Sequence, residues 1–377
     1  MSKAILHISK FYYPTRGGIE SISRQVVDSL KDEYDNVVIC FSNDRCTYDD
    51  IVDGIRVVRV GVQFSLMSQS VSLGYYWKLK KMIRQYHPFA IHIHCPNPLV
   101  YPMVMQCAGR DMKIVLHWHS DILHKGLIYR IIQPAETVIL KKADLIIATS
   151  ENYKMHSVPL AKNLEKVKVL PNGINTSNFG LTISGKKSVE RIRQKYNGKT
   201  IILFTGRHIH YKGLPVLIEA ERFIKGECAI LIAGAGPMTR QLKEQAKGRC
   251  RIEFIGRLSD EYLRYYTWAA DIFAFPSNTK AEAFGVALAE AMYCKTVPVV
   301  FNIEGSGVNW VTLKDITGKE VPLNDIQAYA SAIDELISNP ELREDMAMKA
   351  KERIIAHFTE KKISTILRAY YQSLVLK

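Results

Sequence analysis

The sequence predicts an α/β protein made of two doubly wound, Rossmann-like domains in tandem that face each other across a cleft. Three observations lead to this fold class. The chain has 377 residues, more than one ordinary hydrophobic core accommodates. Short apolar runs rich in β-branched residues alternate with amphipathic stretches, as in βαβ units with a parallel sheet. The alternation also stops near residue 175 and begins again near residue 200.

The first series of strands predicts an N-terminal domain over residues 1–175. Apolar runs typical of strands occupy residues 4–9, 36–42, 55–60, 90–95, 113–119 and 145–150. Helical periodicity separates several of these runs, for example over 20–30 and 75–86. Because helices cover both faces of a parallel sheet, its strands read as nearly continuous apolar runs, as these do.

The second series predicts a C-terminal domain over residues 176–356. Its strand-like runs are 200–206, 228–234, 251–256, 271–277 and 297–301. The less periodic stretch 172–197, which contains several glycines, is interpreted as the linker between the domains. The end of the chain has a helical pattern, and we expect the helix at about 357–377 to pack back on the first domain. Ligands of doubly wound sheets bind at the carboxyl ends of the strands.

Composition narrows the class of protein. No apolar run reaches the roughly 18–20 residues that a transmembrane helix needs, and the N-terminus reads as a first strand rather than a signal peptide. The 7 cysteines show no CxxC spacing, which argues against a disulfide framework and against a zinc site. We therefore expect a cytoplasmic location.

The formal net charge of +14 is spread over both halves of the chain. It could serve an anionic membrane, a nucleic acid or a phosphorylated small substrate, or it could be a solvated surface. No nucleic-acid-binding motif is present, so nucleic acid is not an expected partner. Segment 75–87, YYWKLKKMIRQYH, mixes aromatic residues with Lys78, Lys80, Lys81 and Arg84. It suits an interfacial helix on an anionic membrane, or equally a domain helix with a basic solvated face.

Two strand ends of the first domain carry candidate ligand-binding groups. Gly17 and Gly18 follow the first strand where a helix begins, so the backbone there could approach a phosphate, or could simply turn. His117 and His119 lie on one face of the strand 113–119. A metal site is not expected there, because Asp121 is the one further ligand close by in sequence. His119 at the strand end could instead hold a sugar hydroxyl or a developing charge, whereas His92 and His94 are interpreted as structural.

In the second domain, the first strand ends in GRHIHYKG, where Arg207 and Lys212 flank a turn closed by Gly213. Two fixed cations at a strand end match what a leaving diphosphate needs, since its charge grows as the glycosidic bond breaks. The alternative is an ordinary basic surface loop.

The most informative stretch is 277–294, SNTKAEAFGVALAEAMYC. A strand ends at its start, a loop carries Glu282, and a helix follows. Glu282 and Glu290 are separated by about 12 Å along a helix axis, roughly the length of a sugar-diphosphate-ribose. The N–H groups of Phe284, Gly285 and Val286 would be available to a ligand at the helix start. Two surface glutamates on an alanine-rich helix would have the same spacing.

Taken together, these motifs resemble the retaining glycosyltransferases of the GT-B fold, family GT4 (glycosyl transferases group 1). The resemblance rests on GGIE after the first strand, LPNGIN between the domains, GRxxxxKG, and an E-x7-E element with an embedded ExFG. These motifs extend over most of the chain, and their combination is more specific than any one of them.

The resemblance implies a role for each motif. Gly17 and Gly18 would contact the donor phosphates, and Arg207 and Lys212 would stabilise the leaving nucleoside diphosphate. His119 would contact the transferred sugar and support the charge on its reacting carbon. Glu282 would bind the same sugar, with Glu290 on the ribose. The donor-binding backbone positions would be Ala283, Phe284, Gly285 and Val286.

The resemblance also implies an activity. A sugar would pass from a UDP- or GDP-sugar to a glycan or lipid-linked acceptor, with retention of configuration, no cofactor and no metal. Bacterial O-antigen, capsule or lipopolysaccharide synthesis at the inner face of the plasma membrane is the expected setting. The chain departs from the family where VPVVFNIEGSGVNWV replaces a Gly-Gly-x-x-E loop, which leaves the contacts of Gly305 and Gly307 open. A nucleotide-sugar epimerase and a non-catalytic binding protein remain alternatives.

Overall fold

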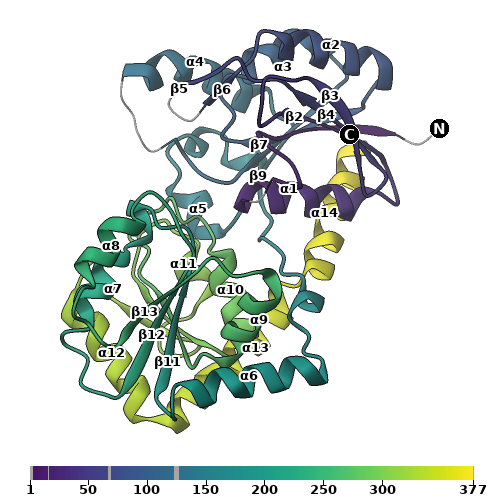
Figure 1. Ribbon diagram of the computed structural model, residues 1–377. Helices are drawn as coiled ribbons and strands as arrows, with labels where there is room; N and C mark the ends of the chain where they lie inside the picture. The colour runs from purple at the N-terminus through teal and green to yellow at the C-terminus, as the bar shows by residue number, and fades with distance from the viewer. Residues whose placement is uncertain (1–2, 16, 67–68, 123–126, 377) are drawn as a thin grey trace. The chain divides into compact units, whose positions relative to one another are not determined.

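The computed structural model describes residues 3–15, 17–66, 69–122 and 127–376 (Figure 1). The chain divides into two compact units. The first comprises Met1–Gly173 with Lys361–Lys377, and the second comprises Ile174–Glu360. The sequence placed the first boundary at 175/176 and the start of the returning segment at about 357. Both sheets have the parallel, helix-covered form that the strand runs predict.

The first unit is built on an eight-stranded sheet in the order β10-β9-β8-β7-β1-β2-β4-β3, in which only the pairing of β3 with β4 is antiparallel. Its strands are β1 (Ala4–Ile8), β2 (Asp35–Phe41), β3 (Tyr48–Val52), β4 (Ile55–Val60), β7 (Ala90–Cys95), β8 (Lys113–Trp118), β9 (Leu145–Ala148) and β10 (Val167–Val169). Strands β5 (Phe64–Leu66) and β6 (Gln69–Val71) pair antiparallel in a separate two-stranded sheet. The helices are α1 (Gly18–Leu30), α2 (Gly74–Tyr86), α3 (Tyr101–Cys107), α4 (Leu127–Lys142), α5 (Glu151–His156) and α14 (Glu360–Val375), with 3-10 turns at Leu160–Lys162 and Leu164–Lys166.

The second unit is built on a six-stranded parallel sheet in the order β13-β12-β11-β14-β15-β16. Its strands are β11 (Thr200–Thr205), β12 (Cys228–Ala233), β13 (Ile252–Gly256), β14 (Ile272–Phe275), β15 (Val297–Phe301) and β16 (Lys319–Val321). The helices are α6 (Ile183–Lys195), α7 (Leu214–Ala220), α8 (Thr239–Gln245), α9 (Asp260–Ala269), α10 (Val286–Tyr293), α11 (Val308–Val311), α12 (Ile326–Ser338) and α13 (Pro340–His357), with 3-10 turns at Thr176–Phe179 and His210–Lys212.

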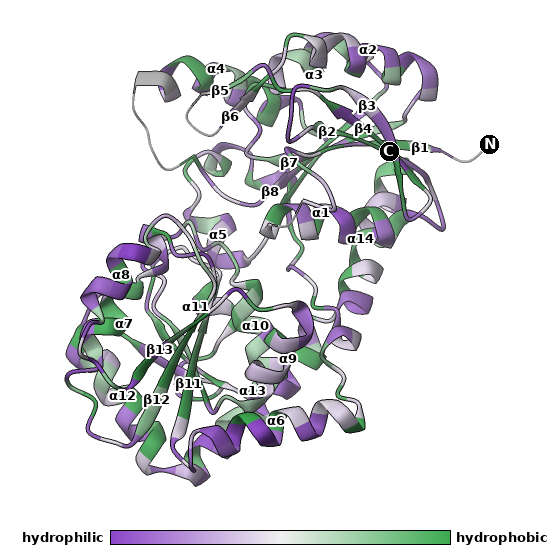
Figure 2. Ribbon diagram, viewed as in Figure 1, coloured by the Kyte–Doolittle hydropathy of each residue, from purple (hydrophilic) through white to green (hydrophobic). Residues whose placement is uncertain are grey.

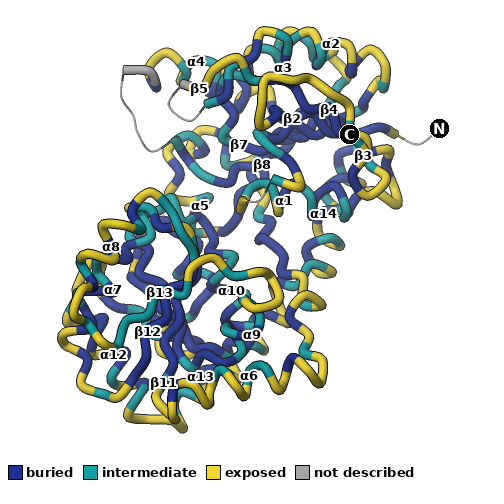
Figure 3. Tube along the Cα trace, viewed as in Figure 1, coloured by how far each residue is buried: buried dark blue, intermediate teal, exposed yellow. Residues whose placement is uncertain are grey.

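Alternation along the strands builds the two cores of the second unit. Ile202 and Phe204 of β11 pack on one face with residues of α7 and α12, whereas Ile201 and Leu203 pack on the other face with α10 and α13. The central strands β11, β12, β14 and β15 are accordingly largely apolar (Figure 2) and buried along nearly their whole length (Figure 3). Burial on both faces explains why these segments read as continuous apolar runs.

The interpretation of 172–197 as a linker is wrong for most of that stretch, because the second unit begins at Ile174 and half of the stretch forms helix α6. Thr182 caps the helix by accepting a hydrogen bond from the Gly185 N–H at 3.1 Å. A Cβ at position 185 would lie 2.9 Å from the Tyr265 ring, so this glycine allows α6 to approach α9 closely. A glycine taken as a loop signal is therefore a packing requirement within a helix.

Helix α14 belongs to the first unit, and its contacts show how it is attached. The Tyr371 hydroxyl and His92 Nδ1 are hydrogen-bonded at 2.7 Å. Arg368 Nε donates to the Ser29 carbonyl at 2.7 Å, and the Ser29 and Ser364 hydroxyls are 2.6 Å apart. Among the described residues, no helix combines the length and hydropathy required to cross a bilayer.

Candidate active site

The second sheet reverses its strand order between β11 and β14. From β11 the chain proceeds outward to β12 and β13, whereas β14 leads to β15 and β16 on the other side. The loops that follow β11 and β14 therefore leave the sheet side by side, at the position where doubly wound sheets bind ligands. The first of these loops carries Arg207 and Lys212, and the second carries Glu282.

Lys212 and Glu282, 70 positions apart in the chain, form a hydrogen-bonded ion pair through Nζ and Oε2. Each side chain is only 12% exposed. The Ser277 hydroxyl donates to the same carboxylate oxygen at 3.1 Å. Gly213 makes the approach of the two loops possible, since it has φ +65° and a Cβ there would lie 1.8 Å from the Pro276 carbonyl oxygen.

The backbone that follows Glu282 is held by the loop after β15. Ser306 Oγ donates to the Glu282 carbonyl at 2.5 Å, and the Gly307 N–H donates to the Ala283 carbonyl at 3.1 Å. This loop replaces the family's Gly-Gly-x-x-E element, and its contacts were left open by the sequence. Ser277 and Ser306 had no predicted role, although the glycines on either side of Ser306 allow the backbone to approach closely.

Helix α10 begins at Val286, after Gly285 in a left-handed conformation with φ +83°. Ala283 and Phe284 are buried, so a ligand could meet only their backbone. The first N–H groups of α10 have no acceptor within the helix. They are therefore available where the sequence predicted a ligand.

Glu290 lies in the last turn of α10 and is partly buried. Burial, together with the negative charge of Asp260, raises the pKa of Glu290 to about 7. A carboxyl group with this pKa changes charge within the physiological range. Arg207, by contrast, is exposed at the end of β11 and forms no ion pair with the described residues.

In the first unit, Gly17 and Gly18 are exposed where α1 begins, after the loop that follows β1. The Glu20 carboxylate lies against Gly17, and a Cβ at that position would be 2.1 Å from Oε2. Burial raises the pKa of Glu20, and the positive charge of Lys10 acts in the opposite direction. The glycine pair thus stands at a helix N-terminus, as the sequence predicted.

His119 follows the last residue of β8 and is 7% exposed. Its Nε2 is 2.9 Å from His94 Nδ1 of the adjacent strand. The parallel register of β7 and β8 pairs His94 with His117, so the alternate residues of both strands lie on one face. The expectation that only Asp121 lies near His117 and His119 is wrong, because strand pairing brings His92 and His94 to them. Asp121 instead accepts hydrogen bonds from Trp118 Nε1 and Ser157 Oγ.

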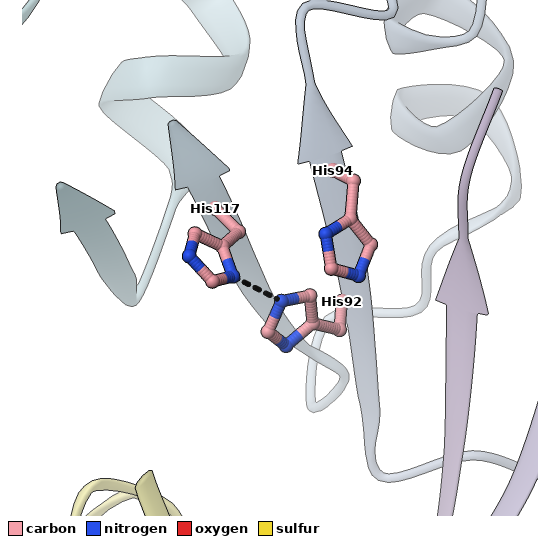
Figure 4. Close-up of side chains that lie close together, drawn as sticks. All are labelled: His92, His94 and His117. Atoms are coloured by element: carbon pink, nitrogen blue, oxygen red, sulfur yellow. Dashed lines mark hydrogen bonds between the residues drawn. The ribbon is translucent and has the colours of Figure 1, made fainter. Parts of the chain in front are cut away.

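His92, His94 and His117 each place a ring nitrogen within 4.8 Å of the others (Figure 4). His92 Nε2 and His117 Nδ1 are hydrogen-bonded at 3.3 Å. The rings of His94 and His117 are stacked, with an interplanar angle of 28°. Both ring nitrogens of His92 are engaged in hydrogen bonds, Nδ1 with Tyr371 and Nε2 with His117, so a metal ion could bind His92 only if one of these bonds were broken.

Two family models match the chain and together cover most of it. Residues 16–178 match Glycosyltransferase Family 4, and residues 186–353 match Glycosyl transferases group 1. The chain belongs to the GT4-type glycosyltransferases. It is therefore an enzyme that transfers sugars. This family membership argues against the two alternatives, a nucleotide-sugar epimerase and a non-catalytic binding protein.

Curated relatives align over nearly the full length of this glycosyltransferase. The O-antigen chain mannosyltransferase C of Escherichia coli is 29% identical over 94% of this chain and 94% of its own. The D-rhamnosyltransferase WbpZ of Pseudomonas aeruginosa is also 29% identical, over 94% of this chain and 92% of its own.

Solved structures share the GT-B fold. A sucrose-phosphate synthase from Thermosynechococcus elongatus superposes with a TM-score of 0.82 at 21% identity, over 99% of both chains. Anabaena HepE in complex with UDP superposes with a TM-score of 0.79 at 19% identity, over 99% of this chain and 100% of its own. The glycosyltransferase therefore consists of two Rossmann-like domains of GT-B type.

The buried histidines of this glycosyltransferase predict sensitivity to acid. Burial lowers the pKa of His7 to about 4 and that of His119 to about 3. Between these values and the unfolded pKa of about 6.5, the unfolded chain binds more protons than the folded chain. The free energy of unfolding should therefore decrease as the pH falls below 6.5, by about 2 kcal/mol at pH 5 for each such histidine.

Urea unfolding at a series of pH values measures this effect. The His7→Asn variant should show a shallower pH dependence than the wild type, whereas His210→Asn, at an exposed position, should keep the wild-type slope. An unfolding free energy that stays constant between pH 7 and pH 5 would contradict burial of neutral histidines.

Proposed function

We propose that this glycosyltransferase moves a sugar from a nucleoside-diphosphate donor to a glycan or lipid-linked acceptor, with retention of configuration and without a divalent metal. The observation that carries the proposal is the junction of Lys212 and Glu282 at the reversal of the second sheet. A cation for the diphosphate and an acceptor for sugar hydroxyls stand next to each other there. Arg207 adds a second, exposed cation in the loop that follows β11, the loop that also carries Lys212.

The charges of the site support transfer without a metal. In the bond-breaking step, negative charge accumulates on the leaving diphosphate, and fixed cations stabilise that state more than the ground state. Lys212 and Arg207 supply such cations from this chain. The first turn of α10 adds backbone N–H groups, and Gly17 and Gly18 stand at a helix start of the first unit, a type of position that favours anions.

The surroundings of Glu282 support its role as a sugar-binding group rather than a nucleophile. Its carboxylate oxygen already accepts hydrogen bonds from Lys212 and Ser277, which lowers its nucleophilicity. Retention without an enzyme nucleophile requires departure and attack on the same face of the sugar. In that reaction the leaving phosphate takes the proton of the acceptor hydroxyl.

The similar proteins support a class of acceptor and a class of donor for this enzyme. One relative named as an O-antigen chain mannosyltransferase and another named as a D-rhamnosyltransferase support a cell-surface polysaccharide as the acceptor. We propose that transfer takes place at the inner face of the bacterial membrane. A fold neighbour solved in complex with UDP supports a nucleoside diphosphate as the leaving group. The names of these relatives specify no nucleotide, and the UDP complex favours a UDP-sugar, so UDP-sugars and GDP-sugars are both tested.

Replacement of Glu282 tests the site. Glu282→Gln should lower kcat at least about 100-fold, because an interaction made with the reacting sugar is lost. The measurement is release of GDP or UDP that depends on acceptor, with the donor chosen by a thermal-shift screen of nucleotide sugars. Glu244→Gln, at an exposed position of the same unit, is the matched control and should keep wild-type turnover. Wild-type turnover in Glu282→Gln would remove Glu282 from the site.

The raised pKa of Glu290 predicts a pH-dependent affinity for nucleotide. The ionised carboxylate accepts hydrogen bonds from two ribose hydroxyls much more strongly than the neutral acid does, and Glu290 loses its charge as the pH falls through about 7. The Kd of the nucleoside diphosphate should therefore increase about tenfold between pH 8 and pH 6. Calorimetric titration of Glu290→Gln controls for titration of the phosphates, and its Kd should change much less. Equal pH dependence in both proteins would place the ribose elsewhere.

Helix α2 supports the proposed contact with an anionic membrane. Its apolar residues Tyr75, Leu79, Met82 and Ile83 are buried in the first unit, as a domain helix requires. Trp77, 67% exposed, lies on the outward face, where it lines an open depression together with Lys80, Lys81, Arg84 and Gln85. A tryptophan surrounded by cations suits the headgroup region of an anionic bilayer.

Binding to vesicles tests this surface. Vesicles rich in phosphatidylglycerol should bind the protein at physiological salt, and the triple variant Lys80→Gln, Lys81→Gln, Arg84→Gln should bind about 100-fold more weakly, at about 1 kcal/mol per cation. Pure phosphatidylcholine vesicles are the control. Equal binding of the variant and the wild type to anionic vesicles would contradict a membrane role for α2.

A further inference from the structure

Five buried histidines form a continuous series of ring contacts in the first unit, tilted at His92 and stacked among the last three members. They lie on β1, on β7, and at the end of β8. We refer to the following residues as the histidine stack: His7, His92, His94, His117 and His119. The rings of neighbouring members are in contact, from His7 with His92 to His117 with His119. Only the last member lies beyond the end of its strand, where ligands of such sheets bind.

Two contacts fix the ring of His119. Its Nε2 is hydrogen-bonded to His94 Nδ1 at 2.9 Å, and the two rings are nearly parallel, with an interplanar angle of 5°. The ring of His117 stacks on it with centroids 4.3 Å apart. The hydrogen bond restricts rotation of the His119 ring within its own plane, and stacking on His117 restricts the tilt of that plane. With Nε2 occupied, a ligand of His119 would have to use Nδ1.

The hydrogen bond also selects a tautomer. His94 Nε2 is buried and has no hydrogen-bond partner in the described part of the chain. If that nitrogen carried the proton, an N–H donor would be buried without an acceptor, which proteins rarely tolerate. The proton of His94 is therefore placed on Nδ1, where it is donated to His119 Nε2. His119 must then carry its own proton on Nδ1.

We propose that His94 is a positioning residue for sugar transfer, which orients His119 and leaves the Nδ1 N–H of His119 as a hydrogen-bond donor to the sugar. The inference rests on the proposed function and on the role that the family resemblance implies for His119, a contact with the transferred sugar. It adds a second residue, 25 positions earlier in the chain, that acts only through His119.

The rest of the histidine stack is consistent with a rigid, uncharged pair. Burial, reinforced by neighbouring histidines, lowers the pKa of His94 well below its usual range, and burial lowers the pKa of His119 to about 3. A parallel hydrogen-bond chain connects Tyr371 of α14 to His92 and His92 to His117. The ring that stacks on His119 is therefore itself held in place.

Steady-state kinetics of two substitutions at position 94 test the proposal. His94→Leu keeps the volume but removes the hydrogen bond, and it should lower kcat 10- to 100-fold with the donor KM changed less than about threefold. His94→Asn places an amide near the position of Nδ1, and it should recover at least about a third of wild-type kcat. His7→Leu is the matched control, because His7 is equally buried but does not contact His119.

The outcomes separate this inference from the proposed function. Absence of acceptor-dependent transfer in the wild type would refute the proposed function. Normal kcat in His94→Leu, when His119→Leu is impaired, would refute positioning alone. Equal losses of kcat in His94→Leu and His7→Leu would also refute it, since they indicate a structural effect.

Nitrogen-15 NMR of the histidine side chains gives a second readout that does not depend on turnover. We expect the wild-type signal of His119 to show a protonated Nδ1 and an unprotonated Nε2. The opposite tautomer, with the proton on Nε2, would overturn the inference. His94→Leu should shift the Nε2 resonance of His119, because its hydrogen-bond donor is removed.

Discussion

The ion pair between Lys212 and Glu282 joins the two loops that leave the second sheet at its reversal. Because both side chains are nearly buried, their desolvation offsets much of their mutual attraction, and loss of either would leave an uncompensated charge. The pair is thus better understood as a means of holding two functional groups in place than as a source of stability. Gly213 is the structural condition for it, since any side chain there would collide with Pro276.

The polar groups of the two candidate regions differ in charge: those of the second unit are ionised and paired, whereas those of the first unit are neutral. In the second unit, ionised side chains are neutralised by one another and by the hydroxyl of Ser277. In the first unit, His94 and His119 are kept uncharged by burial, so they can be stacked without the repulsion that imidazolium rings would suffer. A diphosphate leaving group requires charge, whereas a sugar hydroxyl requires only a directed donor or acceptor.

The sequence predicts individual helices and strands better than it predicts the tertiary contacts between them. Buried strands such as β12 are evident because both faces are apolar, and the position of Glu282 before a helix is evident from the loop around it. The edge strand β3 was not predicted, although Asp53 and Gly54, both with positive φ, mark the hairpin turn that forms it. Side-chain contacts between neighbouring strands also could not be predicted from the sequence. The hydrogen bond between His94 and His119 forms only when β7 and β8 pair in the observed register, and neither strand's sequence specifies that register.

The chain order imposes a constraint on how the first unit is completed. The second unit is continuous, from Ile174 to Glu360, whereas the first includes a segment that comes after it. That segment supplies Tyr371, whose hydroxyl is the partner of His92 within the sheet. Without it, a buried imidazole nitrogen would lose its hydrogen bond, at a cost of about 1–3 kcal/mol. The first unit can therefore reach its full stability only after the second has been synthesised, and α14 is as much a part of the histidine stack's surroundings as the strands are.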